Sequence, residues 1–217
     1  MMRTFGWPEF LFILEAAKWT IALSAIAFAG GSIVGLMVAL ARTAESRVLQ
    51  FAATVFTQIF QGTPLLLQLF LVFFGAPILG LDINPWLAAA AALILNSGAF
   101  LGEIWRGCIQ AVPRGQLEAA QALSLSYYWR MRDVVLPQAM KIAVAPTVGY
   151  LVQIIKGTSL AAIIGFTEIT RAGQIINNAT FQPLVVFGVV AAIYFVLCWP
   201  LSLSLIHISE PTRQEAI

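Results

Sequence analysis

Long runs of apolar residues dominate this chain, and short stretches that carry most of its charges separate them. A helix needs about twenty apolar residues to cross the hydrocarbon core of a bilayer. Five segments meet or approach this length, and we predict spans at residues 19–41, 50–78, 86–106, 139–156 and 182–203. The pattern therefore predicts an all-α integral membrane protein with about five transmembrane helices.

Composition supports this class and excludes several others. The 217 residues are 60% hydrophobic and only 10% charged, whereas a soluble domain carries roughly a quarter charged residues. A net charge of +2 is too small to suggest nucleic-acid binding. Cys108 and Cys198 lie far apart, so we expect no disulfide framework. The sequence contains no metal-ligand spacing and no nucleophile with a neighbouring base, so we expect neither a metal site nor catalytic residues.

The basic residues predict the orientation of the chain in the membrane, because cytoplasmic loops are enriched in Lys and Arg. With the N-terminus outside, seven basic residues fall in inner loops and four in outer segments. The inner set is Arg42, Arg47, Arg106, Arg114, Arg130, Arg132 and Lys141, and the outer set is Arg3, Lys18, Lys156 and Arg171. We therefore predict an outer N-terminus and an inner C-terminus. We expect no secretory signal, because the early apolar run stops at Glu15 and Lys18, which makes Trp19 the predicted entry of the first span.

The second apolar segment is interrupted by Gln61-Gly62-Thr63-Pro64. Proline removes a backbone donor and clashes with the preceding turn, and in lipid the freed groups need protein or water as partners. Two interpretations stay open: a discontinuous helix that lines a translocation path, and a packing kink. Thr63 and Gln68, on either side of the break, are candidate residues of a substrate path.

Polar side chains within the third span provide the other candidates. Asn96 and Ser97 lie at mid-span, where polar groups are costly and often functional, although they also serve as hydrogen bonds between helices. Glu103 and Arg106 follow, three residues apart on one helical face. Glu103 is either half of a capping or interface ion pair, or a contact with the partner subunit or the pore mouth. In the first span, Gly31 and Gly35 predict a close contact between helices.

A polar stretch between the third and fourth spans predicts a helical hairpin. Residues 116–123 are good helix formers, with an apolar face made by Leu117, Ala120 and Leu123, or by Ala119 and Leu123. Ser126 is a predicted N-cap for a second helix, which Pro137 then ends. By itself, this pattern describes an amphipathic hairpin at the membrane surface.

The sequence Gly115-Gln116-Leu117-Glu118-Ala119-Ala120, followed by Leu136-Pro137-Gln138-Ala139, resembles the Glu-Ala-Ala loop of binding-protein-dependent ABC importer permeases. In that family the loop forms a short helix that docks on a separate ATPase. The resemblance implies that the coupling residues are Gln116, Glu118, Ala119, Ala120, Leu123 and Ser124. Ser124 stands where the family usually has glycine, which enters positive φ freely.

Further motifs resemble the polar amino-acid branch of that family. Gln61 replaces the usual arginine of an Arg-Gly-Thr-Pro sequence, and Phe100 stands where tyrosine is common in the run 96–106. The segment from Lys156 onward also matches, and there Thr158 or Ser159 is a candidate cap of a half-helix.

The resemblance implies a non-catalytic permease subunit of an importer for polar amino acids in a bacterial cytoplasmic membrane. Its implied partners are a cytoplasmic ABC ATPase dimer, an extracytoplasmic solute-binding protein and a second permease subunit, identical or paralogous. ATP and Mg would be bound by the ATPase, because this chain has no Gly-x-x-x-x-Gly-Lys-Ser/Thr sequence. The alternative is an ion-coupled secondary transporter or channel subunit, which predicts uptake without an ATPase.

The end of the chain departs from this pattern. Residues 203–217 resemble the in-frame translation of a transposase adapter used to prepare sequencing libraries. We therefore interpret residues 1–202 as one transmembrane domain and residues 203–217, which include His207, as non-native. The alternative is a genuine short cytoplasmic tail.

Overall fold

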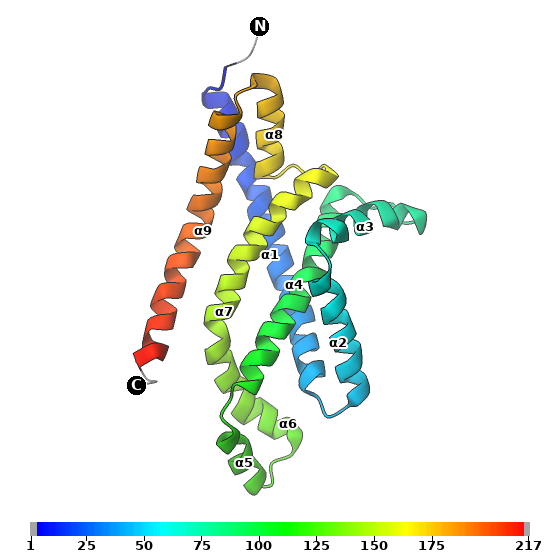
Figure 1. Cartoon of the computed structure of the whole chain (residues 1–217), viewed down its shortest axis with the longest axis vertical. Coiled ribbons are helices and arrows are strands. Elements are labelled where there is room, and N and C mark those ends of the chain that lie inside the picture. Colours follow the sequence, from blue (N-terminus) through cyan, green and yellow to red (C-terminus); the bar gives the residue numbers. More distant parts are fainter. Residues whose placement is uncertain (1–3, 215–217) are drawn as a thin grey trace.

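A computed structural model describes the backbone of residues 4–214 and the side chains of residues 4–204 (Figure 1). Every regular element in the described part of the chain is a helix. The α-helices are α1 (Trp7–Thr43), α2 (Arg47–Gly62), α3 (Leu65–Ile78), α4 (Pro85–Gln110), α5 (Arg114–Ala122), α6 (Tyr127–Trp129), α7 (Leu136–Gly157), α8 (Ile169–Thr180) and α9 (Pro183–Gln214). A π-helical segment, η1 (Arg130–Val135), precedes α7, and a 3₁₀ segment, η2 (Thr158–Ile164), follows it.

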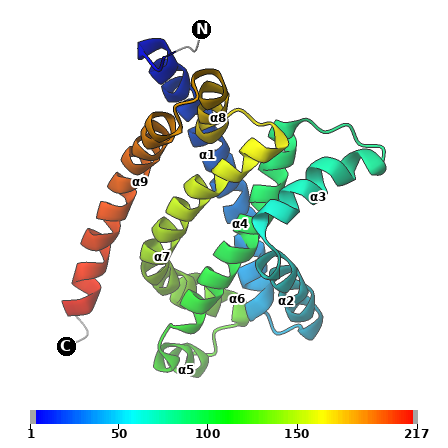
Figure 2. The same cartoon turned by 45° about the horizontal axis from the view of Figure 1, so that its top comes forward.

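The long helices run along the length of the molecule, and the short ones lie at its two ends (Figures 1 and 2). The start of α1 and the whole of α8 lie at one end. The end of α1, the start of α2 and the hairpin α5–α6 lie at the other. Four helices are long and apolar enough to cross a membrane, and the pair α2–α3 makes a fifth candidate span. The prediction of an all-α membrane protein with about five spans is confirmed.

Glycine-mediated packing joins α1 to α4. A Cβ atom added to Gly31 would lie 2.5 Å from Ser97 Cβ, and one added to Gly35 would lie 2.9 Å from Leu101 Cβ. The contact is reciprocal, since a Cβ at Gly98 would meet Val34 Cγ1 at 2.5 Å. Small residues four apart let two helix backbones approach closely in a membrane. The predicted close contact at Gly31 and Gly35 is confirmed, with α4 as the partner.

The first helix begins earlier than the predicted span. It starts at Trp7 rather than near Trp19 and passes through Glu15 and Lys18 without interruption. The Glu9 carboxylate accepts a hydrogen bond from the Gly6 amide at 3.0 Å, and Pro8 occupies the first turn, where its missing donor is harmless. Glu15 and Lys18 form an exposed ion pair one turn apart on the helix, so they do not end it.

The break at Gly62–Pro64 is far sharper than a kink. Helices α2 and α3 meet at 102°, so the segment predicted as one span at residues 50–78 consists of two helices that turn a corner. Pro64 is the N-cap of α3 and has an extended ψ of 136°, which interrupts the helical hydrogen bonds there. In both views α3 leaves the body of the bundle (Figures 1 and 2).

The last helix, α9, extends to Gln214 and therefore into the segment 203–217 that we interpret as non-native. The side chains from residue 205 onward and the backbone of residues 215–217 lie outside the described part. The interpretation of this tail stays a prediction.

Candidate functional site

The predicted coupling helix is α5, and it presents a mixed polar and apolar surface away from the bundle. Gln116, Glu118 and Ala119 are exposed, and the side chain of Leu123 is 75% exposed. Ala120 is only 3% exposed and faces the body of the protein. The helix therefore has one buried anchor and a free outer face.

The buried side of this hairpin continues into a small apolar core that joins the spans. Val112, Val135 and Ala139 are buried together there, and Leu117 packs against them. The core thus links the end of α4 to the start of α7 through the hairpin. The predicted apolar face is only partly correct, because Leu117 and Ala120 face inward whereas Leu123 faces outward.

Ser124 makes the turn that ends α5. Its φ is +56°, so this serine adopts the left-handed conformation that glycine would adopt without strain. The Ser124 amide donates to the Gln121 carbonyl at 2.8 Å, and the Leu125 amide donates to the Ala120 carbonyl at 3.2 Å. This pair of bonds is the Schellman motif. The sharp turn therefore forms despite the missing glycine.

Ser126 stands at the N-cap of α6, but its side chain makes no capping hydrogen bond. The capping part of that prediction is wrong. Helix α6 has only three residues and passes directly into η1, so little of an independent helix needs a cap.

A second polar site lies at the corner between α2 and α3. The Gln68 side chain, 5% exposed, donates from Nε2 to the Phe60 carbonyl at 2.8 Å and to the Thr63 carbonyl at 3.0 Å. Asn96 Nδ2 donates to Gln68 Oε1 at 3.0 Å. These amides satisfy carbonyl groups that the break frees, which membrane-embedded backbone requires. The structure therefore brings together three predicted path residues, Thr63, Gln68 and Asn96.

Aromatic rings from two helices border this corner. The Tyr150 hydroxyl lies 3.4 Å from Asn96 Oδ1, and the Tyr150 ring stacks on Phe100 with centroids 5.4 Å apart. Gln61, which replaces the family's usual arginine, is exposed, and its amide donates to the Ala99 carbonyl at 3.3 Å. The corner is thus lined by amides and hydroxyls, and Gln61 and Thr63 face open space.

Ser97, next to Asn96, belongs mainly to the contact between α1 and α4. It is 1% exposed and packs against Gly31 in the contact between α1 and α4. Its hydroxyl has no hydrogen-bond partner among the described residues. The geometry favours packing between helices over a lining position for Ser97.

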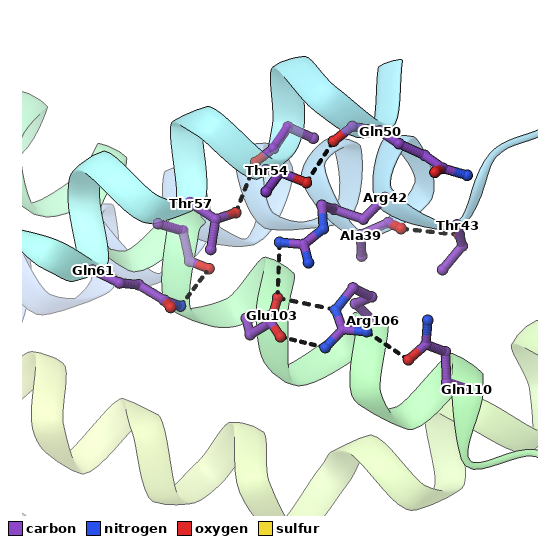
Figure 3. Close-up of polar contacts among 12 residues, drawn as sticks. Ala39, Arg42, Thr43, Gln50, Thr54, Thr57, Gln61, Glu103, Arg106 and Gln110 are labelled. Carbon is purple, nitrogen blue, oxygen red and sulfur yellow. Dashed lines mark hydrogen bonds and ion pairs between the residues drawn. The ribbon is translucent and has the colours of Figure 1, made fainter. Parts of the chain in front are cut away.

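Glu103 lies about two turns beyond Asn96 on α4, in a charged cluster of its own (Figure 3). The Arg106 guanidinium binds both Glu103 carboxylate oxygens, with Nε 3.0 Å from Oε2. Arg42 of α1 contributes a second cation, with Nη1 3.2 Å from Oε2. The predicted pair of Glu103 and Arg106 is confirmed, and Arg42 is a partner that the sequence did not identify. One acid between two bases leaves this half-buried site with a net positive charge.

Four polar side chains on α2 form a stripe that we did not predict. Gln50, Thr54, Thr57 and Gln61 occupy one face of α2 and lead from the charged cluster toward the corner (Figure 3). Their spacing of four, three and four residues places them on a single helical face. That spacing within an apolar span was the signal that could have identified them.

At the opposite end, Glu168 caps α8. Its carboxylate is fully buried and accepts hydrogen bonds from the Thr170 and Arg171 amides, both at 2.9 Å. The Tyr194 hydroxyl of α9 donates to it at 2.6 Å. Burial raises the pKa of Glu168 above its ordinary value, although these hydrogen bonds oppose the rise.

Thr158 and Ser159 are not the half-helix caps that we expected. Their hydroxyls donate back into α7, to the Ile155 and Lys156 carbonyls, each at 2.7 Å. Helix α7 passes into η2 without a break, so no helix N-terminus is available for these residues to cap. The next N-terminus is that of α8, where Glu168 is the cap.

Comparison with known proteins places this architecture in a family. Residues 31–212 match the family described as binding-protein-dependent transport system inner membrane component. The chain is 34% identical over 190 residues to the probable amino-acid ABC transporter permease protein YckA of Bacillus subtilis, covering 88% of this chain and 84% of that protein. It is 35% identical over 198 residues to the glutamine transport system permease protein GlnP of Escherichia coli K12, covering 90% of each.

Solved structures agree. A chain from the crystal structure of an amino acid ABC transporter with histidines superposes with a TM-score of 0.86 at 32% identity, covering 92% of this chain and 94% of that one. A chain of the inward-facing MetNI methionine ABC transporter, at 18% identity, shares the fold with a TM-score of 0.80 and covers 95% and 99%. The chain therefore belongs to the family of binding-protein-dependent transport system inner membrane components, the permease subunits of ABC importers.

Proposed function

We propose that this chain is the transmembrane subunit of an ATP-driven importer of polar amino acids in a bacterial cytoplasmic membrane. A solute-binding protein delivers the solute at the end that carries α8, and a cytoplasmic ABC ATPase dimer binds the end that carries α5. The observation that carries the proposal is a helix with the Glu-Ala-Ala sequence that projects from a membrane bundle with its outer face exposed.

The hairpin has the geometry of a coupling element. Glu118 and Leu123 offer an ATPase one carboxylate and one large apolar side chain. Ala120 anchors the helix on the core that contains Val112 and Val135. Because this core is close-packed, a push on α5 is transmitted to both α4 and α7.

The chemistry of ATP hydrolysis belongs to the partner in this proposal. The chain contributes no phosphate-binding loop, so ATP and Mg are bound by the ATPase dimer. The chain itself is non-catalytic and changes shape in response.

The solute passes along the polar face of α2 and the corner at Thr63, Gln68 and Asn96. Thr63 and Gln61 are exposed on the isolated subunit, so a second permease subunit, identical or paralogous, completes the walls. Glu103, with Arg42 and Arg106, lies at the inner end of this path. The exposed amide of Gln61 and the exposed hydroxyl of Thr63 suit a polar solute, since such groups exchange hydrogen bonds with it without a fixed charge.

The coupling role is tested by Glu118→Lys in the full importer, reconstituted with its ATPase and binding protein in liposomes. We expect uptake and transport-stimulated ATP turnover to fall about tenfold, because the variant reverses the charge that Glu118 offers the ATPase and a loss of about 1.4 kcal/mol is a factor of ten. Membrane insertion should persist, because Glu118 is exposed.

The matched control is Glu45→Lys, which reverses another exposed carboxylate at the same end but in the turn between α1 and α2. Its loose pair with Arg130, at 3.7 Å, contributes little. Normal uptake by Glu118→Lys, or uptake by vesicles that lack the ATPase, would contradict the proposal.

A further inference from the structure

An apolar groove of about 540 Å³ opens at the end of the bundle that carries α5. Its walls come from α1, α2, α6, η1 and α7, and include Met37, Leu40, Leu49, Tyr128, Met131 and Leu136. Met37 and Tyr128 are 58% and 60% exposed, so nothing within this subunit covers them.

One cation, Arg132, stands at the rim of this groove beside two aromatic rings. Its guanidinium carbon lies 5.4 Å from the Trp129 ring centroid and 6.0 Å from that of Tyr128. Its ion pair, with the neighbouring Asp133, spans 3.7 Å, and both side chains are more than half exposed. An exposed pair of this kind is weak. The aromatic rings therefore fix a guanidinium whose N–H groups make no hydrogen bond to a described residue.

The groove lies where acyl chains meet headgroups. Its walls include the final turns of α1 and the first turn of α7, both parts of candidate spans. Tyr127, Tyr128 and Trp129 are exposed beside it, and such side chains are enriched at the membrane–water interface. Apolar surface at the end of a span is suited to contact with lipid acyl chains.

The charge at this end favours an anionic lipid. The inner segments of the chain contain seven basic and four acidic residues, which leaves an excess of three positive charges. The acidic residues are Glu45, Glu103, Glu118 and Asp133. Guanidinium groups bind phosphate through paired N–H donors, and each basic residue near an anionic leaflet contributes about 1 kcal/mol.

We propose that the groove binds one anionic phospholipid of the inner leaflet. An acyl chain lies between Met37 and Leu136, and the lipid phosphate accepts hydrogen bonds from the Arg132 guanidinium.

The position of the groove connects the lipid to the coupling hairpin. The η1 segment that forms one wall follows α5 and α6 directly in the chain. The Tyr127 hydroxyl donates to the Thr43 carbonyl at 3.2 Å and fastens this segment to the end of α1. A lipid between η1 and α1 braces the hairpin against the bundle, so anionic lipid regulates how firmly the hairpin is held.

The test is native mass spectrometry of the delipidated full-length protein, titrated with dioleoylphosphatidylglycerol or dioleoylphosphatidylcholine. We expect the protein to bind phosphatidylglycerol more tightly than phosphatidylcholine. Arg132→Gln should weaken phosphatidylglycerol binding about fivefold, the change that about 1 kcal/mol produces, and weaken phosphatidylcholine binding less, because the choline cation offsets the charge of the phosphate. Lys141→Gln is the matched control, since it removes an exposed cation from the same end but outside the groove.

A second variant tests the groove itself. Ala41→Phe places a ring in the groove, so it should weaken the binding of both lipids. The proposal is overturned if Lys141→Gln acts as strongly as Arg132→Gln, because the attraction is then unspecific surface charge. It is also overturned if Ala41→Phe leaves lipid binding intact, or if that variant separates permease copies instead, because the groove is then a contact between subunits.

Discussion

Helices α1 and α4 contact each other along their length, whereas α2 and α3 meet end to end at a corner, and the two contacts are stabilised in different ways. Helices α1 and α4 pack with glycine against valine or serine, without a hydrogen bond from Ser97 and with no room for one more methyl group. Helices α2 and α3 meet at 102° through amide side chains that satisfy freed carbonyls. Close packing holds the middle of the first pair, with the ion pair of Arg42 and Glu103 near its inner end, whereas the second pair depends on hydrogen bonds. Glycine therefore allows two membrane helices to pack tightly, whereas a buried glutamine allows a helix to break by binding the carbonyl groups that the break frees.

We expect the largest loss of stability from a substitution at Gly31, in the contact between α1 and α4. Gly31→Ala places a methyl group 2.5 Å from Ser97 Cβ, which cannot rotate away, so we expect a loss of about 1–3 kcal/mol in unfolding free energy. Gly75→Ala is the control, because that helical position has no neighbour within 4 Å and should gain up to about 1 kcal/mol in helix propensity. Equal stability of the two variants in detergent unfolding would show that the α1–α4 contact is loose.

The corner between α2 and α3 is tested by a substitution at Gln68. Gln68→Leu removes the donor of the Phe60 and Thr63 carbonyls and should cost about 1–3 kcal/mol, the penalty for buried unpaired groups. Gln58→Leu changes an exposed glutamine on α2 and should stay within about 0.5 kcal/mol. Detergent unfolding measures the stability of both variants, and an unchanged stability of Gln68→Leu would show that the amide does not stabilise the corner.

The cap of α8 is the counterpart of the corner at Gln68, because here the Glu168 carboxylate binds free amide groups at the start of a helix. The pKa of Glu168 is raised in the folded state, so its contribution to stability is complete below the ordinary glutamate value of 4.5 and is lost as the pH rises through the raised value. Relative to Glu168→Gln, the wild-type protein should therefore lose stability as the pH rises above 4.5. Tyr194→Phe removes a hydrogen bond that opposes the rise, so it should steepen this loss. Unfolding midpoints across pH 4 to 7 decide the matter, and parallel profiles for wild type and Glu168→Gln would refute it.

The smallest effect is expected at the turn after α5. Ser124→Gly relieves a left-handed residue and should stabilise the protein by about 0.5–1 kcal/mol, because the strain relieved exceeds the entropy that glycine adds. Ser126→Gly, at a position with φ of −64°, should destabilise it slightly. Thermal unfolding compares the two, and destabilisation by Ser124→Gly would mean that the serine has a role beyond the turn.

Much of the fold followed from local pattern. The apolar runs located the long helices, and Gly31 and Gly35 announced a close contact, although only the structure identified α4 as the partner. Pro64 announced a break but not its angle, because the angle depends on what Gln68 and Asn96 can reach across it.

Two of the missed features depend on residues that are distant in sequence. Glu103 and Arg106 are three residues apart and were paired correctly, whereas Arg42 joins them from another helix. Thr158 was a candidate cap because helix N-caps favour threonine and serine, but the cap of the next helix is Glu168, which Tyr194 of α9 helps to hold. The start of α1 was missed because Glu15 and Lys18 neutralise each other within the helix.

The glycine contact between α1 and α4 limits how this permease can move. Sliding either helix by one residue would bring Val34 and Val38 against positions that carry side chains, so the two helices travel as a single strut. Any movement of the other helices during transport therefore takes place relative to this pair, which moves as one body.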